Sequence, residues 1–456
     1  MKNILLNTDS YKSSHYLQYP PKSQYVSSYI EARRPLGECT LFFGLQAFIK
    51  AYLLTPFTRE DLEEAKVILT AHGLPFNYTD WEYILEKYDG YFPLEISAVE
   101  EGMLVPTSSP LVQVVNTDER LPWLTSYIET ALLRAIWYPT TVATISYNIK
   151  QTIRRYLEET AENVEALLPF KLHDFGARGA SSDESAMLGG MAHLVNFQGT
   201  DTLSAIVGAR RYYNCEMAGF SIPASEHSTM TSWTKEGEAD AYANMLKQFA
   251  KKDALFAVVS DSYDIYNAVS KLWGKELKEQ VKQSGATLVI RPDSGDPKTM
   301  VLEVMRRLYE SFGGTTNAKG YIVLDSSVRV IQGDGVDAVA IEQILQALKE
   351  AGFSAENIAF GMGGALLQQP NRDTFSFAMK ASAIQVDGTW RDVYKDPVSD
   401  SNKRSKRGRL ALLEDFSTIR EEALAGRINL LQPVYKNGKL LKETNFEAIR
   451  RRADEN

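Results

Sequence analysis

The chain has 456 residues, of which 44% are hydrophobic and 24% charged, as in ordinary globular proteins with two or three domains. Its 50 basic and 58 acidic residues give a net charge of −8, which argues against nucleic acid as a partner. Two cysteines, Cys39 and Cys215, exclude a disulfide framework and fit a reducing compartment. No apolar run approaches the ~18 residues of a membrane span. We therefore expect a cytoplasmic protein without a membrane partner.

Residues 1–165 mix helical and strand patterns without a repeat. Apolar spacing predicts helices over 41–54, 61–72, 122–137 and 141–166, and strands over 94–99 and 111–115. Pro139 is predicted to separate the last two helices, because proline interrupts a helix. Toward the other end of the chain, 375–386 predicts a strand that returns to this domain, and 441–456 predicts a short charged helix.

From residue 171 the pattern changes to short apolar runs, each followed by a polar loop and a helical stretch. The seven runs are 172, 194–195, 219–220, 256–259, 288–290, 328–331 and 358–360. This alternation predicts a parallel sheet whose loops meet at one edge, but does not decide whether the sheet closes into a barrel. We expect an α/β protein with a parallel, barrel-like α/β domain over 166–375. This domain would pack on a mixed α+β domain built from both chain ends, 1–165 and 376–456.

The seven loops are rich in carboxylates, with arginine, histidine and glycine among them. Their charged and imidazole side chains are Asp174, Asp201, Asp261, Asp264, Asp293, Asp296, Asp334, Asp337, Arg178, Arg291, His173 and His227. Carboxylate oxygens suit Mg²⁺, while guanidinium groups and glycine-rich turns suit phosphate. No His/Cys set has zinc-ligand spacing. The residues alone therefore predict an enzyme that acts on a phosphorylated small molecule.

Several features have more than one interpretation at this stage. The glycine-rich turn 361–364 could cradle a phosphate or serve only as a turn. His227 could act in chemistry or as a structural hydrogen-bonding group, and Phe175 and Tyr263 could be core residues or stacking plates. The basic run 403–409 could be a solvated loop, a phosphate-steering rim or a dimer contact.

Many ordered stretches of the chain resemble one family. The matching segments are 7–12 with 15–16, 171–179, 194–202, 224–229, 259–267, 290–295, 329–337, 357–364, 395–398 and 402–406. In these segments the chain resembles the nicotinamide phosphoribosyltransferases, type II phosphoribosyltransferases that make nicotinamide mononucleotide in NAD salvage. The chain departs from the family pattern at Ala177 and Ala378, where that pattern has tyrosine and serine.

The resemblance implies a pocket for a pyridine ring. Phe175 would stack on one face of the ring, and Tyr11 of the partner subunit would stack on the other face. Asp201 would accept the amide N–H of nicotinamide and repel the carboxylate of nicotinic acid. The other implied members of this pocket are Ser221, Arg291 and Arg178.

The resemblance also implies a phosphate and ribose side of the site. Asp293 and Asp334, with Gly333, would lie near the ribose, where Mg²⁺ is expected. The implied 5′-phosphate contacts are Gly363, Gly364, Arg372, Lys380 and Arg33 of the partner subunit. His227 would be phosphorylated when ATP is hydrolysed. His227, Asp293, Asp334 and Arg291 are therefore the expected catalytic residues.

The implied reaction joins nicotinamide to 5-phosphoribosyl pyrophosphate, with Mg²⁺ and coupled ATP, in a homodimer with shared sites. The runner-up is a nicotinate phosphoribosyltransferase, against which Asp201 argues. An α/β-barrel aldolase or metal-dependent hydrolase would need a Schiff-base lysine at a strand end or a two-histidine metal set, and neither is present. A non-catalytic protein that binds a phosphorylated ligand would not need His227, Asp293 and Asp334 together.

Overall fold

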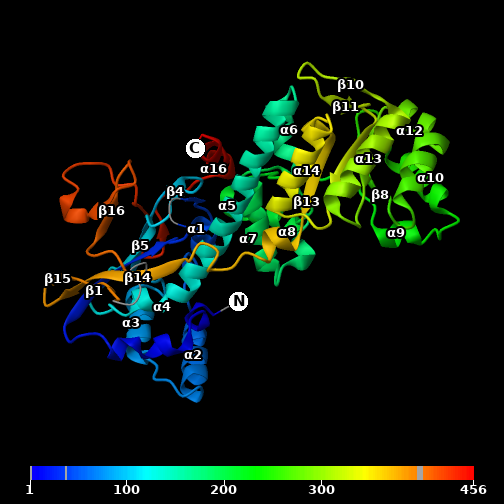
Figure 1. Ribbon diagram of the computed structural model, residues 1–456. Coiled ribbons are helices and arrows are strands. Elements are labelled where there is room, and N and C mark those ends of the chain that lie inside the picture. Colours follow the sequence, from blue (N-terminus) through cyan, green and yellow to red (C-terminus); the bar gives the residue numbers. More distant parts are fainter. Residues whose placement is uncertain (1–2, 36–37, 398–403, 456) are drawn as a thin grey trace. The chain divides into compact units, whose positions relative to one another are not determined.

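The computed structural model describes residues 3–35, 38–397 and 404–455 (Figure 1). Contacts within the chain define a first unit of residues 1–144, 208–216 and 370–456, and a second unit of 145–207 and 217–369. These limits differ from the boundaries at 165 and 375 expected from the sequence. Two of the divisions fall inside helices, α5 (Glu129–Thr160) and α8 (Leu203–Tyr213), so no change in loop composition marks them.

The first unit is built on a seven-stranded antiparallel sheet. In spatial order its strands are β15 (Thr389–Asp392), β14 (Ala378–Val386), β1 (Ser23–Glu31), β5 (Pro110–Asn116), β3 (Leu94–Ala98), β18 (Gln432–Lys436) and β19 (Lys439–Leu440). The strands predicted over 94–99 and 111–115 are confirmed, and β14 confirms the returning strand by pairing with β1 along its length. Two small sheets add β2 (Cys39–Leu41) with β4 (Leu104–Pro106), and β16 (Leu410–Leu412) with β17 (Thr418–Arg420).

Helices and an aromatic core complete this unit. The helices are α1 (Leu45–Phe48), α2 (Arg59–Ala71), α3 (Tyr78–Lys87), α4 (Leu124–Tyr127) and α16 (Phe446–Asp454). The helix predicted over 41–54 is only partly correct, because 39–41 form β2 and a π-helix over Ile49–Leu53 follows α1. Trp81 is buried and contacts Phe57, Trp123 and Tyr127 edge to face, with ring centroids 4.9 to 5.6 Å apart.

The helix break predicted at Pro139 is wrong, because α5 continues through this residue. Gly44 lies against the proline ring: a Cβ at this position would stand 2.4 Å from Cγ of Pro139 and 3.1 Å from the carbonyl oxygen of Ala135. Gly44 has a φ of +109°, a backbone conformation that favours glycine. The glycine thus leaves room for a proline inside the helix, a contact between distant residues that local sequence does not reveal.

The second unit contains six parallel strands. Their order is β7 (Gly199–Thr200), β6 (Leu172–Asp174), β13 (Ile358–Met362), β12 (Val328–Gln332), β9 (Thr287–Arg291) and β8 (Leu255–Val259). Five of the seven predicted runs lie in these strands. The run 194–195 instead lies at the end of α7 (Asp183–Leu194), with Leu194 as its last residue and Val195 as its C-cap. The predicted parallel, barrel-like α/β domain is confirmed.

The segment 220–225 closes this sheet into a ring. Phe220 forms a parallel bridge with Gly199 of β7, and Ala224 forms one with Ala257 of β8. The amide of Phe220 donates to the carbonyl of Gln198 at 2.7 Å, and the amide of Ala257 donates to that of Pro223 at 2.9 Å. Backbone hydrogen bonds therefore run around the whole barrel. The alternation of strands and helices in the sequence did not decide whether the sheet closes, and these hydrogen bonds show that it does.

Helices alternate with the strands of the barrel (Figure 1). They are α6 (Val164–Leu167), α7, α9 (His227–Thr231), α10 (Glu238–Phe249), α11 (Ile265–Asn267), α12 (Lys278–Ser284), α13 (Pro297–Phe312), α14 (Ala338–Glu350) and α15 (Gly364–Leu367). A π-helix over Ala268–Glu276 follows α11, and β10 (Gly314–Thr316) pairs with β11 (Ile322–Leu324). Among the helices of the described residues, none is long and apolar enough to cross a membrane.

Lys171, immediately before β6, is a buried lysine whose Nζ donates to the carbonyls of Glu356 and Ile358, both at 2.8 Å. Burial, assisted by the charge of Arg329, lowers its pKa from 10.5 to about 7. The unfolded chain therefore binds more protons between these two values, so stability rises with pH across this window. We expect the unfolding free energy of the wild type to gain about 2 kcal/mol from pH 7 to about pH 9 relative to Lys171→Met. Thermal unfolding of both proteins measures this, and a constant difference would contradict it.

Candidate active site

The loops after the barrel strands place most of the predicted site residues on one rim. Because the six strands are parallel, their carboxyl ends lie at the same end of the ring. Of the predicted site residues, those in the second unit are Phe175, Arg178, Asp201, Ser221, His227, Arg291, Asp293, Gly333, Asp334, Gly363 and Gly364. The rim is therefore the candidate active site.

The ring of Phe175 lies over glycine backbone at the ends of two strands. A Cβ at Gly361 of β13 would stand 1.9 Å from Cε2 of Phe175, and one at Gly333 would stand 3.0 Å from the same atom. The side chain also packs on the apolar cluster of Ala257, Val289 and Ile331. Phe175 is thus a half-buried plate on top of the barrel interior, in keeping with the stacking interpretation.

Asp201 follows β7 and receives two hydrogen bonds on one oxygen. Its Oδ1 lies 3.0 Å from Nε2 of His173 and accepts from Oγ of Ser221 at 2.5 Å. Burial acts to raise the pKa of this carboxyl, but these hydrogen bonds, the charge of His173 and that of Arg291 outweigh it and lower the pKa below its ordinary value. The rim therefore presents a carboxylate that is ionised at neutral pH. It is connected to the ring of Phe175 through His173, whose own ring centroid lies 5.2 Å from that of Phe175.

A second cluster connects β8, β9 and α9. Nε2 of His227, the first residue of α9, lies 2.9 Å from Oδ1 of Asp261, which follows β8. Oδ2 of Asp261 accepts from the amide of Asp293 at 3.0 Å and from Oγ of Ser294 at 2.5 Å. Arg291 at the end of β9 donates to both oxygens of Asp293, at 3.2 and 2.9 Å. His227, Arg291 and Asp293 therefore form one network around Asp261.

The phosphate-side residues of the second unit lie on glycine-rich turns. Gly363 and Gly364 follow β13 at the start of α15, and added Cβ atoms there would meet no atom closer than 3.7 Å. Asp334 is exposed in the loop after β12, and Arg178 is exposed in the 3-10 helix Ala177–Gly179. Open backbone amides of this kind suit a phosphate.

Four predicted residues belong to the first unit instead. Tyr11 is 57% exposed in the 3-10 helix Ser10–Leu17, and Arg372 is exposed before β14. Nε of Arg33 donates to the carbonyl of Ser376 at 3.2 Å. Burial and then the charge of Arg33 lower the pKa of Lys380 in β14. Arg33 and Lys380 are therefore neighbours within the first unit, where β1 and β14 pair.

The basic run is anchored by ion pairs over its described part, 404–409, while Lys403 lies outside the described residues. Nζ of Lys406 lies 2.6 Å from the buried carboxylate of Glu31, and Nε of Arg404 lies 2.7 Å from Asp396. The guanidinium of Arg407 lies over the ring of Tyr394, 3.5 Å from its centroid. These contacts hold the segment against the rest of the first unit, which argues against a freely solvated loop.

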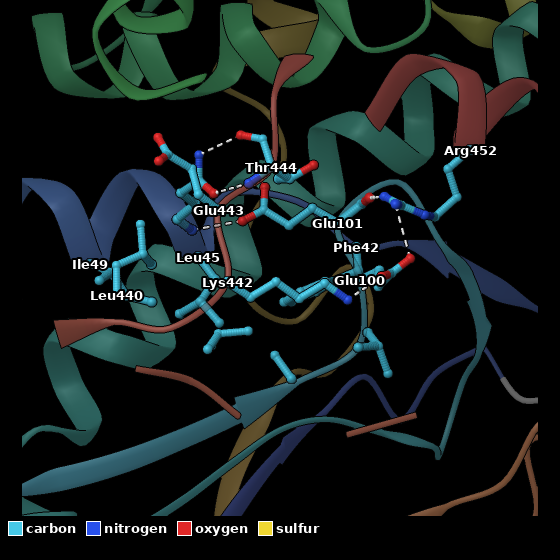
Figure 2. Close-up of a pocket in the computed structure, with 14 residues that line it drawn as sticks. Phe42, Leu45, Ile49, Glu100, Glu101, Leu440, Lys442, Glu443, Thr444 and Arg452 are labelled. Carbon is cyan, nitrogen blue, oxygen red and sulfur yellow. Dashed lines mark hydrogen bonds and ion pairs between the residues drawn. The ribbon is translucent and has the colours of Figure 1, made fainter. Parts of the chain in front are cut away.

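A separate hollow of about 200 Å³ lies within the first unit (Figure 2). Its lining includes Phe42, Leu45, Ile49 and Leu440, and Glu100 forms ion pairs with Lys442 and Arg452 beside them. None of the predicted site residues lines this hollow.

Two residues to which no role was assigned from the sequence contact predicted site residues. His173 contacts Asp201, and Asp261 contacts His227. His173 lies within a strand and Asp261 follows one, so the sequence indicated that both belong to the loop cluster. It did not indicate their partners, which lie 28 and 34 residues away along the chain.

The chain matches two family models over much of its length and known proteins over about the whole of it. The nicotinate phosphoribosyltransferase (NAPRTase) family model matches residues 170–439, and the model of the N-terminal domain of nicotinamide phosphoribosyltransferase matches 3–96. The nicotinamide phosphoribosyltransferase of Xanthomonas campestris is 52% identical over 100% of this chain and 98% of that protein. The enzyme of the same name from Acinetobacter baylyi is 33% identical over 99% and 97%.

Solved structures share the fold. Nicotinate-nucleotide pyrophosphorylase from Pyrococcus furiosus superposes with a TM-score of 0.61 at 15% identity, over 99% of this chain and 95% of that one. Human nicotinic acid phosphoribosyltransferase gives 0.57 at 15% identity, over 98% and 92%. The family models and relatives confirm the resemblance seen in the sequence: the chain belongs to the nicotinate phosphoribosyltransferase family.

Proposed function

We propose that this chain is a nicotinamide phosphoribosyltransferase, which joins nicotinamide to 5-phosphoribosyl pyrophosphate and releases pyrophosphate. The carboxylate of Asp201, connected to the ring of Phe175 through His173, is the observation that supports the choice of base. A carboxylate accepts the N–H of a carboxamide and repels the carboxylate of nicotinic acid. The 52% identical relative of that name supports the same choice.

The chemistry follows from positioning and charge. The bond between C1 of the ribose and pyrophosphate breaks, C1 becomes oxocarbenium-like, and the pyridine nitrogen bonds to its opposite face. That nitrogen carries no proton, so no general base is needed. Phe175 would hold the ring, and Arg291 would orient the amide oxygen, while the amides of Gly363 and Gly364 would hold the 5′-phosphate.

Mg²⁺ is the cofactor that the donor set suits. Asp293 and Asp334 supply hard oxygen donors, but the described residues contain no group of three or more side chains arranged around a metal. Both aspartates would therefore hold Mg²⁺ together with phosphate oxygens of the substrate, the usual arrangement for this ion. Bound there, the ion would neutralise charge on the leaving pyrophosphate.

ATP is the proposed co-substrate, with His227 as the phosphoryl acceptor. Asp261 holds Nε2 of His227 at 2.9 Å, while Nδ1 lies 3.8 Å from Oδ2 of Asp293. Transfer to Nδ1 would break the bond between the γ-phosphorus and ADP and form a nitrogen–phosphorus bond. A phosphoryl group on this ring would lie beside the Arg291–Asp293 pair and so could alter substrate binding.

A product assay tests the proposed function. Purified protein, Mg²⁺ and 5-phosphoribosyl pyrophosphate are incubated with nicotinamide or with nicotinic acid, with and without ATP, and the products are separated by mass. We expect nicotinamide mononucleotide and a larger yield with ATP. A preference for nicotinic acid would overturn the choice of base, and no product from either base would favour a binding protein.

The proposed active form is a homodimer with shared sites, as the resemblance to the family implies, with Tyr11 and Arg33 supplied to each site by the partner subunit. We expect Tyr11→Ala and His227→Ala each to lack the gain in activity that ATP gives the wild type. Mixed under conditions of subunit exchange, they should regain up to about a quarter of this ATP-dependent gain, because random pairing leaves half of the dimers mixed, each with one intact site. Mixed dimers without recovery would contradict shared sites.

A further inference from the structure

We infer that His173 is a positioning residue for base selectivity: it holds one oxygen of Asp201 and so aims the other at the substituent of the pyridine ring. The inference rests on the proposed function and adds a residue to the site. His173 contacts the selective carboxylate of Asp201, the backbone of Gly199 and the ring of Phe175.

The first contact fixes the carboxylate. A carboxylate can only accept hydrogen bonds, so Nε2 of His173 carries the proton in its 3.0 Å contact with Oδ1 of Asp201. Oγ of Ser221 donates to the same oxygen at 2.5 Å. Among the described residues, no side chain donates to Oδ2, and the Asp201 side chain is 48% exposed. The free oxygen is therefore available to a ligand, and its direction depends on the donors to Oδ1.

The second set of contacts fixes the imidazole. His173 of β6 is paired in register with Gly199 of β7, and a Cβ on Gly199 would stand 2.6 Å from Nδ1 of His173. On its other side the imidazole contacts the ring of Phe175, with centroids 5.2 Å apart. Because the backbone of β7 and an aromatic ring confine it, His173 is a rigid support that joins the stacking plate to the selective carboxylate.

A direct contact between His173 and the base is the competing explanation, and it predicts a different result. Loss of a direct ring contact would weaken both bases equally, since nicotinamide and nicotinic acid share the ring. Loss of a support for Asp201 would weaken nicotinamide and relieve the repulsion of nicotinic acid. The ratio of kcat/KM for the two bases therefore separates the explanations.

The experiment measures this ratio in His173→Ala and His173→Gln. We expect His173→Ala to lower the preference for nicotinamide about tenfold or more, the effect of a hydrogen bond to a charged group. Most of the loss should lie in KM for nicotinamide. His173→Gln should restore much of the preference, because the amide of glutamine can donate from a similar position. His72→Ala, which removes an imidazole from the first unit, should leave the ratio unchanged.

A double-mutant cycle shows whether His173 acts through Asp201. In an Asp201→Ala background, His173→Ala should change the ratio by less than about twofold. An unchanged ratio in His173→Ala alone, or an equal change with and without Asp201, would overturn the inference. Thermal unfolding confirms that each variant is folded.

Failure of the proposed function gives a different result. If the proposed function is wrong, the wild type makes no mononucleotide from nicotinamide. If only this inference is wrong, the wild type prefers nicotinamide and His173→Ala has the same ratio of kcat/KM for the two bases. Calorimetric Kd values for the two bases give the same ratio without turnover. Equal Kd values for the two bases in the wild type would contradict the proposed choice of base, whereas a selective wild type whose Kd ratio is unchanged in His173→Ala would overturn the inference.

Discussion

Replacing Gly361 with alanine is expected to lower kcat/KM for nicotinamide about 100-fold, the cost of misplacing a bound group by roughly an ångström. The added Cβ would stand 1.9 Å from Cε2 of Phe175, a distance that forces the ring to move. Phe175 is half-buried and can turn toward solvent, whereas Gly361 lies within β13 and cannot shift without breaking strand pairs. Steady-state kinetics with nicotinamide measure the effect.

A second glycine of the same loops serves as the control for Gly361→Ala. A Cβ at Gly179 would meet Cα of Gly364 at 3.6 Å, an ordinary van der Waals distance. Gly179→Ala should therefore lower kcat/KM far less than Gly361→Ala. If both variants were equally active and folded, Phe175 would not need the position in which the structure holds it.

Replacing Asp261 with asparagine is expected to lower phosphorylation of His227 by ATP about 10- to 100-fold, the range for losing a charged hydrogen-bond partner. Asp261 is nearly buried and holds Nε2 of His227 at 2.9 Å. Asparagine keeps the shape but loses the negative charge that favours an imidazole protonated at Nε2, the form that leaves Nδ1 free to attack. Labelling with γ-³²P ATP measures the phosphoryl-enzyme directly, and the ATP-dependent gain in kcat/KM should fall in parallel.

Asp264, three residues further along the same loop, is the matched control for this variant. Its Oδ1 accepts from the amides of Tyr266 and Asn267 and so caps α11. Asp264→Asn retains a capping side chain and makes no contact with His227, so labelling should match the wild type. Equal labelling in Asp261→Asn and the wild type would show that the contact with Asp261 does not prepare His227 for phosphorylation.

Local patterns in the sequence predicted much of the second unit. Short apolar runs at regular intervals indicated the strands β6, β8, β9, β12 and β13, because a buried parallel strand reads as an apolar run. The same alternation predicted that loops at 174–179, 260–264 and 291–296 would meet. The prediction at Pro139 was wrong, because the local signal of a proline does not end α5, which continues through it with Gly44 packed against the proline ring.

The sequence by itself thus determined the parallel α/β class, the identity of the polar loops and the family to which the chain belongs. Only the tertiary structure decided that 220–225 closes the ring, that Gly361 makes room for Phe175, and that Asp201 and His227 are held by His173 and Asp261. Periodicity and turn residues act over a few positions and can be read along the chain. Hydrogen-bond partners and clearances depend on the register of strands that are far apart in sequence, which only folding fixes.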